Sequence, residues 1–308
     1  MTMRSLVAIS AAVALLASAC AGPHSSSRGT VASHLVMGGP PECVSRITCL
    51  RGLQEIYGLR FKRFKNLDEV GPLSVAALET NQVQVVRLDS SDPAIPRHHW
   101  VILQDDRAFQ QAGNIIPVIR TAKATDDVRS LLDKVSSTMT QSDLFLLDTE
   151  VGVDHRTPED VARAYVLRKG LLSSPTGAGG PITVGSAAFA ENETLADVYI
   201  DVLKSAGYAV TSRLNAGNRE KNEPDLEAGT IDLLPEYVGN YLSFIDPTVN
   251  TVALAKAVTQ LRLLLAPRGL TVADPSSATD TDTIVVTQAT ADRFHLTKIS
   301  DLARISGP

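Results

Sequence analysis

The chain has 308 residues, a length that suits two lobes of roughly 100–200 residues each. Apolar residues make up 44% and charged residues 20%, which indicates a folded globular protein and excludes a disordered one. The net charge of −5 excludes a basic nucleic-acid-binding protein and fits a neutral or cationic ligand. Three cysteines are too few for a disulfide scaffold or a four-thiolate zinc site.

Residues 1–19 have the features of a secretory signal peptide. Arg4 precedes an apolar run of about a dozen residues and then small residues, as before a cleavage site. The run is shorter than the roughly 20 residues of a transmembrane helix. Cys20 follows the expected cleavage site and resembles the lipidated cysteine of a bacterial lipobox, although Ala17 stands where leucine is preferred. We expect a lipid anchor on Cys20 and a flexible tether over 20–33. An ordinary signal with an unmodified cysteine is the alternative.

Cys43 and Cys49 remain if Cys20 carries lipid. An extracytoplasmic compartment permits oxidation, and a disulfide closing so short a loop contributes roughly 2–2.5 kcal/mol in the chain-entropy treatment. We expect a disulfide between them, with two buried thiols as the alternative. No third and fourth ligand lies nearby in the sequence, so a metal site is not expected.

Beyond the tether, short apolar runs alternate with amphipathic stretches, a pattern typical of an α/β protein. The runs that predict strands are, in chain order, 34–37, 82–88, 100–103, 115–119, 182–184, 231–234 and 283–286. Proline at the first helical position predicts helices at Pro72 and at Pro158, the second capped by Thr157. Apolar residues spaced by three and four predict further helices over 195–202 and 254–265.

The stretch 173–181 is rich in serine, proline and glycine and predicts a linker. Its glycines do not indicate a phosphate-binding loop. Such a loop follows a strand and opens a helix, whereas this stretch lies between a predicted helix and a predicted strand.

Several motifs follow the linker in a consistent order: ITVGSAAFAE at 182–191, GY at 207–208, GTIDL at 229–233 and PEYVG at 235–239. They resemble the opening half of the ProX/OpuC-type (OpuAC family) substrate-binding proteins of ABC importers for glycine betaine, choline and related osmoprotectants. Residues 271–302 look like that family's crossover into its second lobe. The family's second half is similar to motifs that come earlier in this chain: LVMGGPPEC at 35–43, GPL at 71–73, SDPAI at 91–95 and IPVIR at 116–120.

The resemblance covers nearly all of residues 34–305 and implies a two-lobed α/β fold of the periplasmic-binding-protein type (type II) with a two-strand hinge. The swapped order of the halves implies a circular permutation, with the 173–181 linker joining the ancestral termini. A fragment of a tandem array is the alternative. On the permuted interpretation one lobe comprises 97–282, and the other combines 34–92 with 283–308. The lobes would then be connected near 92–99 and 280–283.

The resemblance also implies ligand-binding positions. Tyr237 matches an aromatic residue of the ligand cage, Asn240 a polar donor, Arg46 a residue that binds a ligand carboxylate, and Asp280 a cage carboxylate. Each has a structural alternative: core packing for Tyr237, an ion pair with Glu42 or another nearby acid for Arg46, and a solvated loop position for Asp280.

Other positions depart from the family pattern. Ser186 and Ala187 follow a predicted strand, and Ala187 stands where relatives often place a basic residue. Asp89, Gly113 and Asp282 stand where relatives place cage aromatics. One tyrosine does not supply the roughly 8 kcal/mol of micromolar binding. A polyhydroxylated or aromatic solute therefore remains an alternative to an osmoprotectant.

We expect a monomeric, lipid-anchored receptor on the extracytoplasmic face of the cell membrane. It would capture a small osmoprotectant of the glycine betaine, choline, carnitine or proline class and present it to an ABC permease with its ATPase. No catalytic residue, cofactor, metal or nucleic-acid partner is expected, because the histidines form no zinc-protease motif and no nucleophile elbow is present. A sensor lipoprotein that retains the fold without transport is a further alternative.

Overall fold

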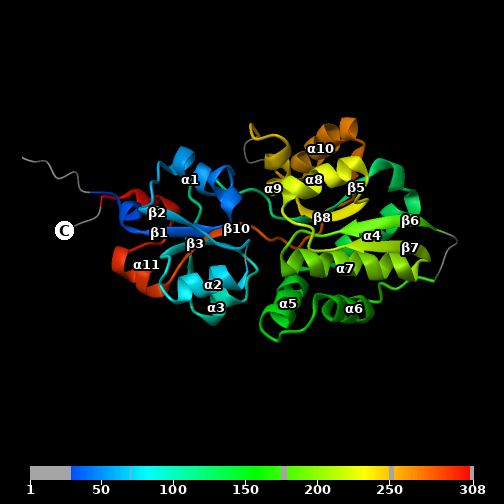
Figure 1. Ribbon diagram of the computed structural model, residues 1–308, viewed down its shortest axis with the longest axis horizontal. Coiled ribbons are helices and arrows are strands. Elements are labelled where there is room, and N and C mark those ends of the chain that lie inside the picture. Colours follow the sequence, from blue (N-terminus) through cyan, green and yellow to red (C-terminus); the bar gives the residue numbers. More distant parts are fainter. Residues whose placement is uncertain (1–28, 70, 175–178, 250–252, 306–308) are drawn as a thin grey trace, which may run out of the picture.

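A computed structural model describes residues 29–69, 71–174, 179–249 and 253–305, which form the two lobes seen in Figure 1. The predicted signal peptide, the predicted lipid site Cys20 and most of the tether lie outside the described residues, as does the centre of the 173–181 linker. Within the described ranges, no helix combines the length and the apolar character needed to cross a membrane.

In the described chain, the first lobe contains a five-stranded sheet in the order β2-β1-β3-β10-β4. Its strands are β1 (Val36–Gly39), β2 (Arg63–Asn66), β3 (Val85–Asp89), β4 (Val101–Ile102) and β10 (Asp282–Val286). Strands β2, β1 and β3 are parallel, and β10 is antiparallel to both β3 and β4. The apolar faces are covered by α1 (Leu50–Tyr57) and α11 (Gln288–Phe294) on one side and by α2 (Pro72–Glu79) and α3 (Ala94–Arg97) on the other.

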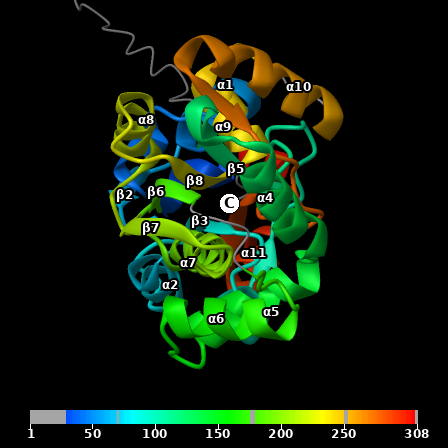
Figure 2. The same ribbon diagram turned by 90° about the vertical axis from the view of Figure 1, so that its right-hand side faces the viewer.

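The second lobe contains a five-stranded sheet within the same described ranges, in the order β7-β6-β8-β5-β9. Its strands are β5 (Ile115–Arg120), β6 (Gly179–Gly185), β7 (Tyr208–Arg213), β8 (Leu233–Tyr237) and β9 (Leu270–Val272). One face packs against α4 (Asp126–Thr138), α5 (Gln141–Gly152), α6 (Pro158–Arg168) and α7 (Ala190–Ser205). The other packs against α8 (Arg219–Ala228), α9 (Val238–Ile245) and α10 (Leu254–Leu265), so that helices lie on both sides of the sheet in Figure 2.

The two sheets have the same connectivity, strand for strand. In each sheet, three parallel strands lie beside an antiparallel strand. The chain forms this antiparallel strand when it arrives from the other lobe. β10 takes this place in the first sheet and β5 takes it in the second. The α/β two-lobed fold predicted from the sequence is confirmed.

Local sequence explains several of the helix boundaries. The predicted helices at Pro72 and Pro158 are confirmed, and the Thr157 hydroxyl accepts a hydrogen bond from Asp160 N at the start of α6. The apolar spacing over 195–202 lies within α7, whose inner face is buried along its whole length. The predicted disulfide is also present: Cys43 and Cys49 are bonded, with their Cα atoms 5.0 Å apart.

Two neighbouring segments connect the lobes, at 110–114 and 273–281. Asn114 and Thr279 form an antiparallel bridge, and Asp280 N donates to Gly113 O at 2.8 Å. A Cβ on Gly113 would lie 1.9 Å from the Asp280 carbonyl oxygen, so this close approach requires glycine. These paired segments form the two-strand hinge.

The first crossing expected at 92–99 was wrong. Residues 97–109 stay with the first lobe, because β4 pairs with β10 at the edge of the first sheet. Phe109 is also only 2% exposed and packs edge-to-face on Tyr57, with ring centroids 6.2 Å apart. The chain therefore leaves the first lobe after Phe109.

Candidate functional site

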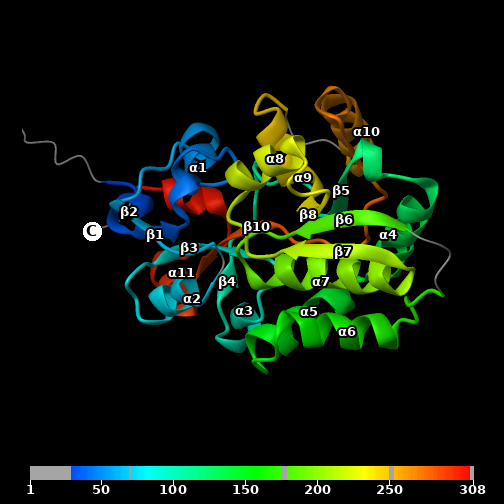
Figure 3. The same cartoon turned by 45° about the vertical axis from the view of Figure 1, so that its right-hand side comes forward.

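A cavity of about 590 Å³ lies between the lobes. The first lobe contributes the start of α2 and the turn that leads into α3, and the second contributes the end of α5 and the turn between β6 and α7. The end of α5 comes close to α3, as Figure 3 shows: a Cβ on Gly152 would lie 3.5 Å from Pro93. The cavity therefore has the interlobe position of a solute site in a hinged two-lobed receptor.

Acidic side chains dominate the polar part of the lining. The lining carboxylates are Asp68, Glu69, Glu79, Asp89, Asp92, Asp148, Glu191 and Glu193. The basic groups in the same lining are Arg97, which is exposed at the rim, and the imidazole of His98. Once its carboxyl groups ionise, this lining favours a cationic solute over an anionic one.

A hydrogen-bond network through Ser91 of the first lobe connects Glu191 of the second lobe with Asp280 of the hinge. The Ser91 hydroxyl lies 2.9 Å from Glu191 Oε2 and 3.0 Å from Asp280 Oδ1. A hydroxyl has one proton to donate, so two hydrogen bonds to carboxyl oxygens require a proton on one of the carboxyl groups. Tyr237 O–H donates to the other oxygen of Glu191. Glu191 and Asp280 therefore share at least one proton in this arrangement.

Burial and mutual repulsion shift the titration of this group. Burial first, and the neighbouring Asp148 charge second, raise the pKa of Glu191 well above its usual value. Burial and then the Asp280 charge do the same to the pKa of Asp148. Burial raises the pKa of Asp280 to about 8, with the Glu191 charge adding to it. Burial also raises the pKa of Asp89, although Arg87 opposes that shift.

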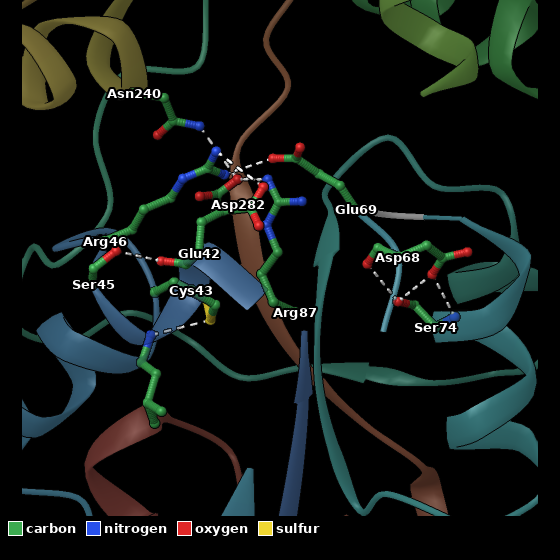
Figure 4. Close-up of a disulfide and its surroundings, with 12 residues drawn as sticks. Glu42, Cys43, Ser45, Arg46, Asp68, Glu69, Ser74, Arg87, Asn240 and Asp282 are labelled. Carbon is green, nitrogen blue, oxygen red and sulfur yellow. Dashed lines mark hydrogen bonds and ion pairs between the residues drawn. A yellow bond between two sulfur atoms is a disulfide. The ribbon is translucent and has the colours of Figure 1, made fainter. Parts of the chain in front are cut away.

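Arg87 pairs with two of the predicted site residues, Asp89 in the cavity lining and Asp282 behind it. Its Nη2 lies 3.0 Å from Asp89 Oδ1 and also pairs with Asp282. Asn240 Nδ2 donates to Asp282 Oδ1 at 3.2 Å and so connects the second lobe to this pair (Figure 4). Asp89 lines the cavity, whereas Asp282 and Asn240 lie outside the lining found in the described chain.

Arg46 lies in a separate ion-pair cluster, also drawn in Figure 4. Its guanidinium is 2.6 Å from Glu69, 3.4 Å from Glu42 and 2.9 Å from Glu220 of the second lobe. Glu42 in turn accepts a hydrogen bond from Asn218 of the second lobe at 3.2 Å. Arg46 therefore contacts carboxylates of the protein on both sides of the lobe boundary.

Phe189 forms the aromatic wall of the cavity. It is partly buried and lines the cavity directly, between β6 and α7. The ring of Tyr237, at the end of β8, stacks behind it with centroids 6.3 Å apart and is only 4% exposed. In the described chain, the lining includes Phe189 and excludes Tyr237. Tyr237 thus acts on the site through Phe189 and Glu191.

The remaining predicted positions shape the backbone around the site. The Ser186 hydroxyl accepts from Asn215 N at 2.7 Å, and Ala187 N donates to Asn192 Oδ1 at 2.7 Å. Both bonds fix the turn that presents Phe189 and Glu191. Gly113 lies in the hinge, where the Asp280 backbone leaves no room for a side chain.

Comparison with known families identifies this arrangement. The family model OpuAC, described as the substrate binding domain of ABC-type glycine betaine transport system, matches residues 27–168 and 180–307.

The chain belongs to this family.

The OpuAC family consists of solute receptors and not of enzymes.

Curated relatives match over about half of their own length. The glycine betaine-binding protein YehZ of Escherichia coli K12 is 28% identical over 137 residues, which cover 43% of this chain and 45% of that protein. The glycine-betaine-binding protein of Pseudomonas aeruginosa PAO1 is 25% identical over 143 residues, 46% of each chain.

Solved structures with distant sequences also align. An ancestral arginine-binding protein bound to arginine has 15% identity and a TM-score of 0.40, with 88% of this chain and 91% of that chain covered. PhnD1 from Prochlorococcus marinus in complex with methylphosphonate has 12% identity and a TM-score of 0.44, with coverage of 88% and 82%.

Sequence reasoning missed part of this OpuAC site. Phe189 and Glu191 lie in the ITVGSAAFAE motif, and Ser91 lies in the SDPAI motif, yet none was singled out as a ligand contact. Asp148 belongs to no family motif used above. The available signal was an acid directly after the apolar run Leu144–Leu147.

Proposed function

We propose that this OpuAC protein is an extracytoplasmic receptor that captures a small solute of the osmoprotectant class between its lobes and delivers it to an ABC importer. The observation that carries the proposal is the family match across both lobes, together with an interlobe cavity lined by each of them. The receptor would be a monomer, and the lipid on Cys20 would hold it beside its permease and ATPase.

The geometry supports a mechanism of closure around the solute. The hinge segments 110–114 and 273–281 pair with each other, so the lobes rotate about a narrow connection. A solute that contacts Phe189 and Glu191 on one lobe and Asp89 on the other stabilises the closed state, because the open state cannot offer both sets of contacts. The permease would then recognise the closed receptor.

We also propose that the chain is a circular permutant of the family arrangement, with lobes that correspond to 29–109 plus 282–305 and to 115–272. The identical connectivity of the two sheets supports this, since a chain that starts at β1 and one that starts at β6 produce the same fold. The family match in two blocks and the half-length alignments to curated relatives agree with swapped halves. Val31 N donates to Arg304 O at 2.9 Å, so the described ends lie together.

Calorimetric titration of the mature protein tests the function. Glycine betaine, choline, carnitine and proline are added separately, and we expect saturable binding of at least one. Absence of binding by all four would overturn the osmoprotectant assignment and leave the fold intact.

A further inference from the structure

The charge of the cavity restricts what it can bind. Eight carboxyl groups line it, against one arginine and one histidine. Some of them are already engaged by the protein: Asp68 accepts from the start of α2, and Glu69 pairs with Arg46. Asp89 also pairs with Arg87, and Asp148 and Glu191 line the cavity, with Asp280 directly behind Ser91. A solute that enters therefore meets carboxyl groups on both lobes.

One carboxyl oxygen has no hydrogen-bond partner. Asp148 Oδ2 is closed to solvent and has no hydrogen-bond partner in the described chain, while Ser91 and Glu191 lie beside the same carboxyl group. A buried acceptor without a donor costs free energy, and a solute that supplies an N–H or O–H group removes that cost. Asp148 lines the cavity from the end of α5, so a solute that binds there lies beside this carboxyl group.

The basic residues near the cavity are poorly placed to hold a solute carboxylate. The Arg87 guanidinium pairs with Asp89 and Asp282, and although its buried Nη1 has no partner in the described chain, the residue lies outside the cavity lining. Arg46 pairs with three carboxylates. Arg97 is exposed at the rim, where solvent and salt weaken an ion pair. A solute carboxylate would thus be surrounded by carboxyl groups, and its basic partners in the lining of the described chain would be the exposed Arg97 and the imidazole of His98.

We propose that the solute is a compact organic cation that carries its own N–H or O–H donor and has no carboxylate. This inference rests on the proposed function, because it assigns the charge of the solute that the receptor captures. The cavity is much larger than a metal ion requires, and its apolar wall includes Val75, Val151 and Phe189. The wall suits the carbon skeleton of the cation, with its charge over the Phe189 face and toward the carboxyl groups.

Binding of such a cation releases protons. In the empty site the groups that face Glu191 are carboxyls and a phenol, and the groups around the rim add further charges. They are Asp89, Asp148, Asp280 and Tyr237 at the centre, with the Arg87 guanidinium beside Asp89 and acting against the raised pKa of Asp280, and Glu69, Glu79, Asp92, Glu193, Arg97 and His98 around them. A cation favours the ionised carboxylates, so a proton held between Glu191 and Asp280 leaves when it binds. Affinity therefore rises as the pH increases toward about 8, where Asp280 ionises in the empty protein.

The decisive comparison uses choline and glycine betaine, which share a trimethylammonium group and differ in a hydroxymethyl against a carboxylate. Putrescine serves as a second donor-bearing cation. Titration calorimetry at pH 7 and pH 8, in two buffers of different ionisation enthalpy, measures the affinity and the protons released. We expect choline or putrescine to bind at least about tenfold more tightly than glycine betaine, with proton release.

The outcomes separate this inference from the proposed function. Glycine betaine that binds as tightly as choline and putrescine, or more tightly, overturns the cation assignment and supports the osmoprotectant receptor. Binding of putrescine alone among these probes supports the cation assignment and, if carnitine and proline also fail to bind, overturns the osmoprotectant class. Absence of binding by all three probes overturns the cation assignment, and it overturns the osmoprotectant class as well when carnitine and proline also fail to bind.

A variant tests the role of Asp148 directly. Asp148→Asn keeps the shape of the side chain and removes its charge. We expect the affinity for the bound cation to fall about tenfold or more, with fewer protons released. Asp154→Asn is the matched control, because Asp154 is an exposed acid six positions further along that does not line the cavity. Equal affinities for Asp148→Asn and wild type, with both variants folded by circular dichroism, would contradict the proposal.

Discussion

Tyr237 and Phe189 are neighbouring aromatic residues with different positions at this site. Tyr237 matches the family's cage residue in sequence, yet it lies behind the cavity with its hydroxyl on Glu191. Phe189 presents its ring to the cavity, because the strand-to-helix turn ends just before it. The aromatic contact available to a cation thus comes from a residue at the start of a helix and not from the end of β8.

Asp280 connects the carboxyl network to the hinge, and its titration predicts how stability depends on pH. Its pKa is raised to about 8 in the folded protein, from an ordinary value of 3.8. Folding therefore favours the protonated form, and the associated stability is present at low pH and is lost as the pH rises to about 8. We expect the empty protein to lose on the order of 1 kcal/mol or more of unfolding free energy between pH 5 and pH 8.

Thermal unfolding of the empty protein across this pH range measures the effect. Asp280→Asn retains an acceptor for Ser91 N and cannot ionise, so its midpoint should fall less steeply with pH than that of the wild type. The midpoint of the variant should still depend on pH, because the pKa values of Asp148 and Glu191 are also raised. A variant whose midpoint follows the wild-type curve would show that another group controls the pH dependence.

The segment between β1 and α1 carries both the disulfide and part of the lobe contact. Cys43 lies in a 3₁₀ turn over Pro41–Val44, and Cys49 immediately precedes α1. The same turn includes Glu42, which accepts a hydrogen bond from Asn218 of the second lobe. The disulfide therefore holds a short turn whose side chains cross to the other lobe.

Removal of the disulfide should lower stability without changing the cavity. For a loop of this length the chain-entropy treatment gives about 2–2.5 kcal/mol, and we expect the Cys43→Ala/Cys49→Ala double variant to lose about that unfolding free energy in urea. Neither cysteine lines the cavity, so the affinity for a solute should stay within about twofold. Wild type under reducing conditions is the control. Equal urea midpoints for the oxidised wild type and the variant would show that the bridge does not stabilise the fold.

The whole molecule is built from two sheets of equal connectivity. The arrangement of the layers therefore does not depend on where the chain begins and ends. Each sheet needs the same three parallel strands and one returning antiparallel strand. Val31 and Arg304 lie beside each other on the first lobe, and both ends of that lobe are visible at the same side of Figure 1. The proposed permutation therefore changes where the chain opens and preserves every layer.

A rearranged chain tests the proposed permutation. Residues 180–305 are placed first and joined by a short flexible linker to 29–174, which restores the family order. We expect this chain to fold and to bind solute with an affinity within about threefold of the natural order, because the joined ends already meet. The control opens the chain at Pro235 inside the buried strand β8 and should not fold. Failure of the restored order to fold, as in the control, would contradict the proposal.

The sequence by itself determined the alternation of strands and helices, the first residues of α2 and α6, the disulfide and the family. Local signals suffice for these features, because helix caps, apolar periodicity and motif order depend on residues near one another in the chain. Tertiary structure alone decided that β4 and Phe109 stay with the first lobe, that Arg46 pairs with Glu220, and that Asp148 meets Glu191. These contacts join residues from different lobes, strands or helices, and their energies depend on burial, which only the packed structure defines.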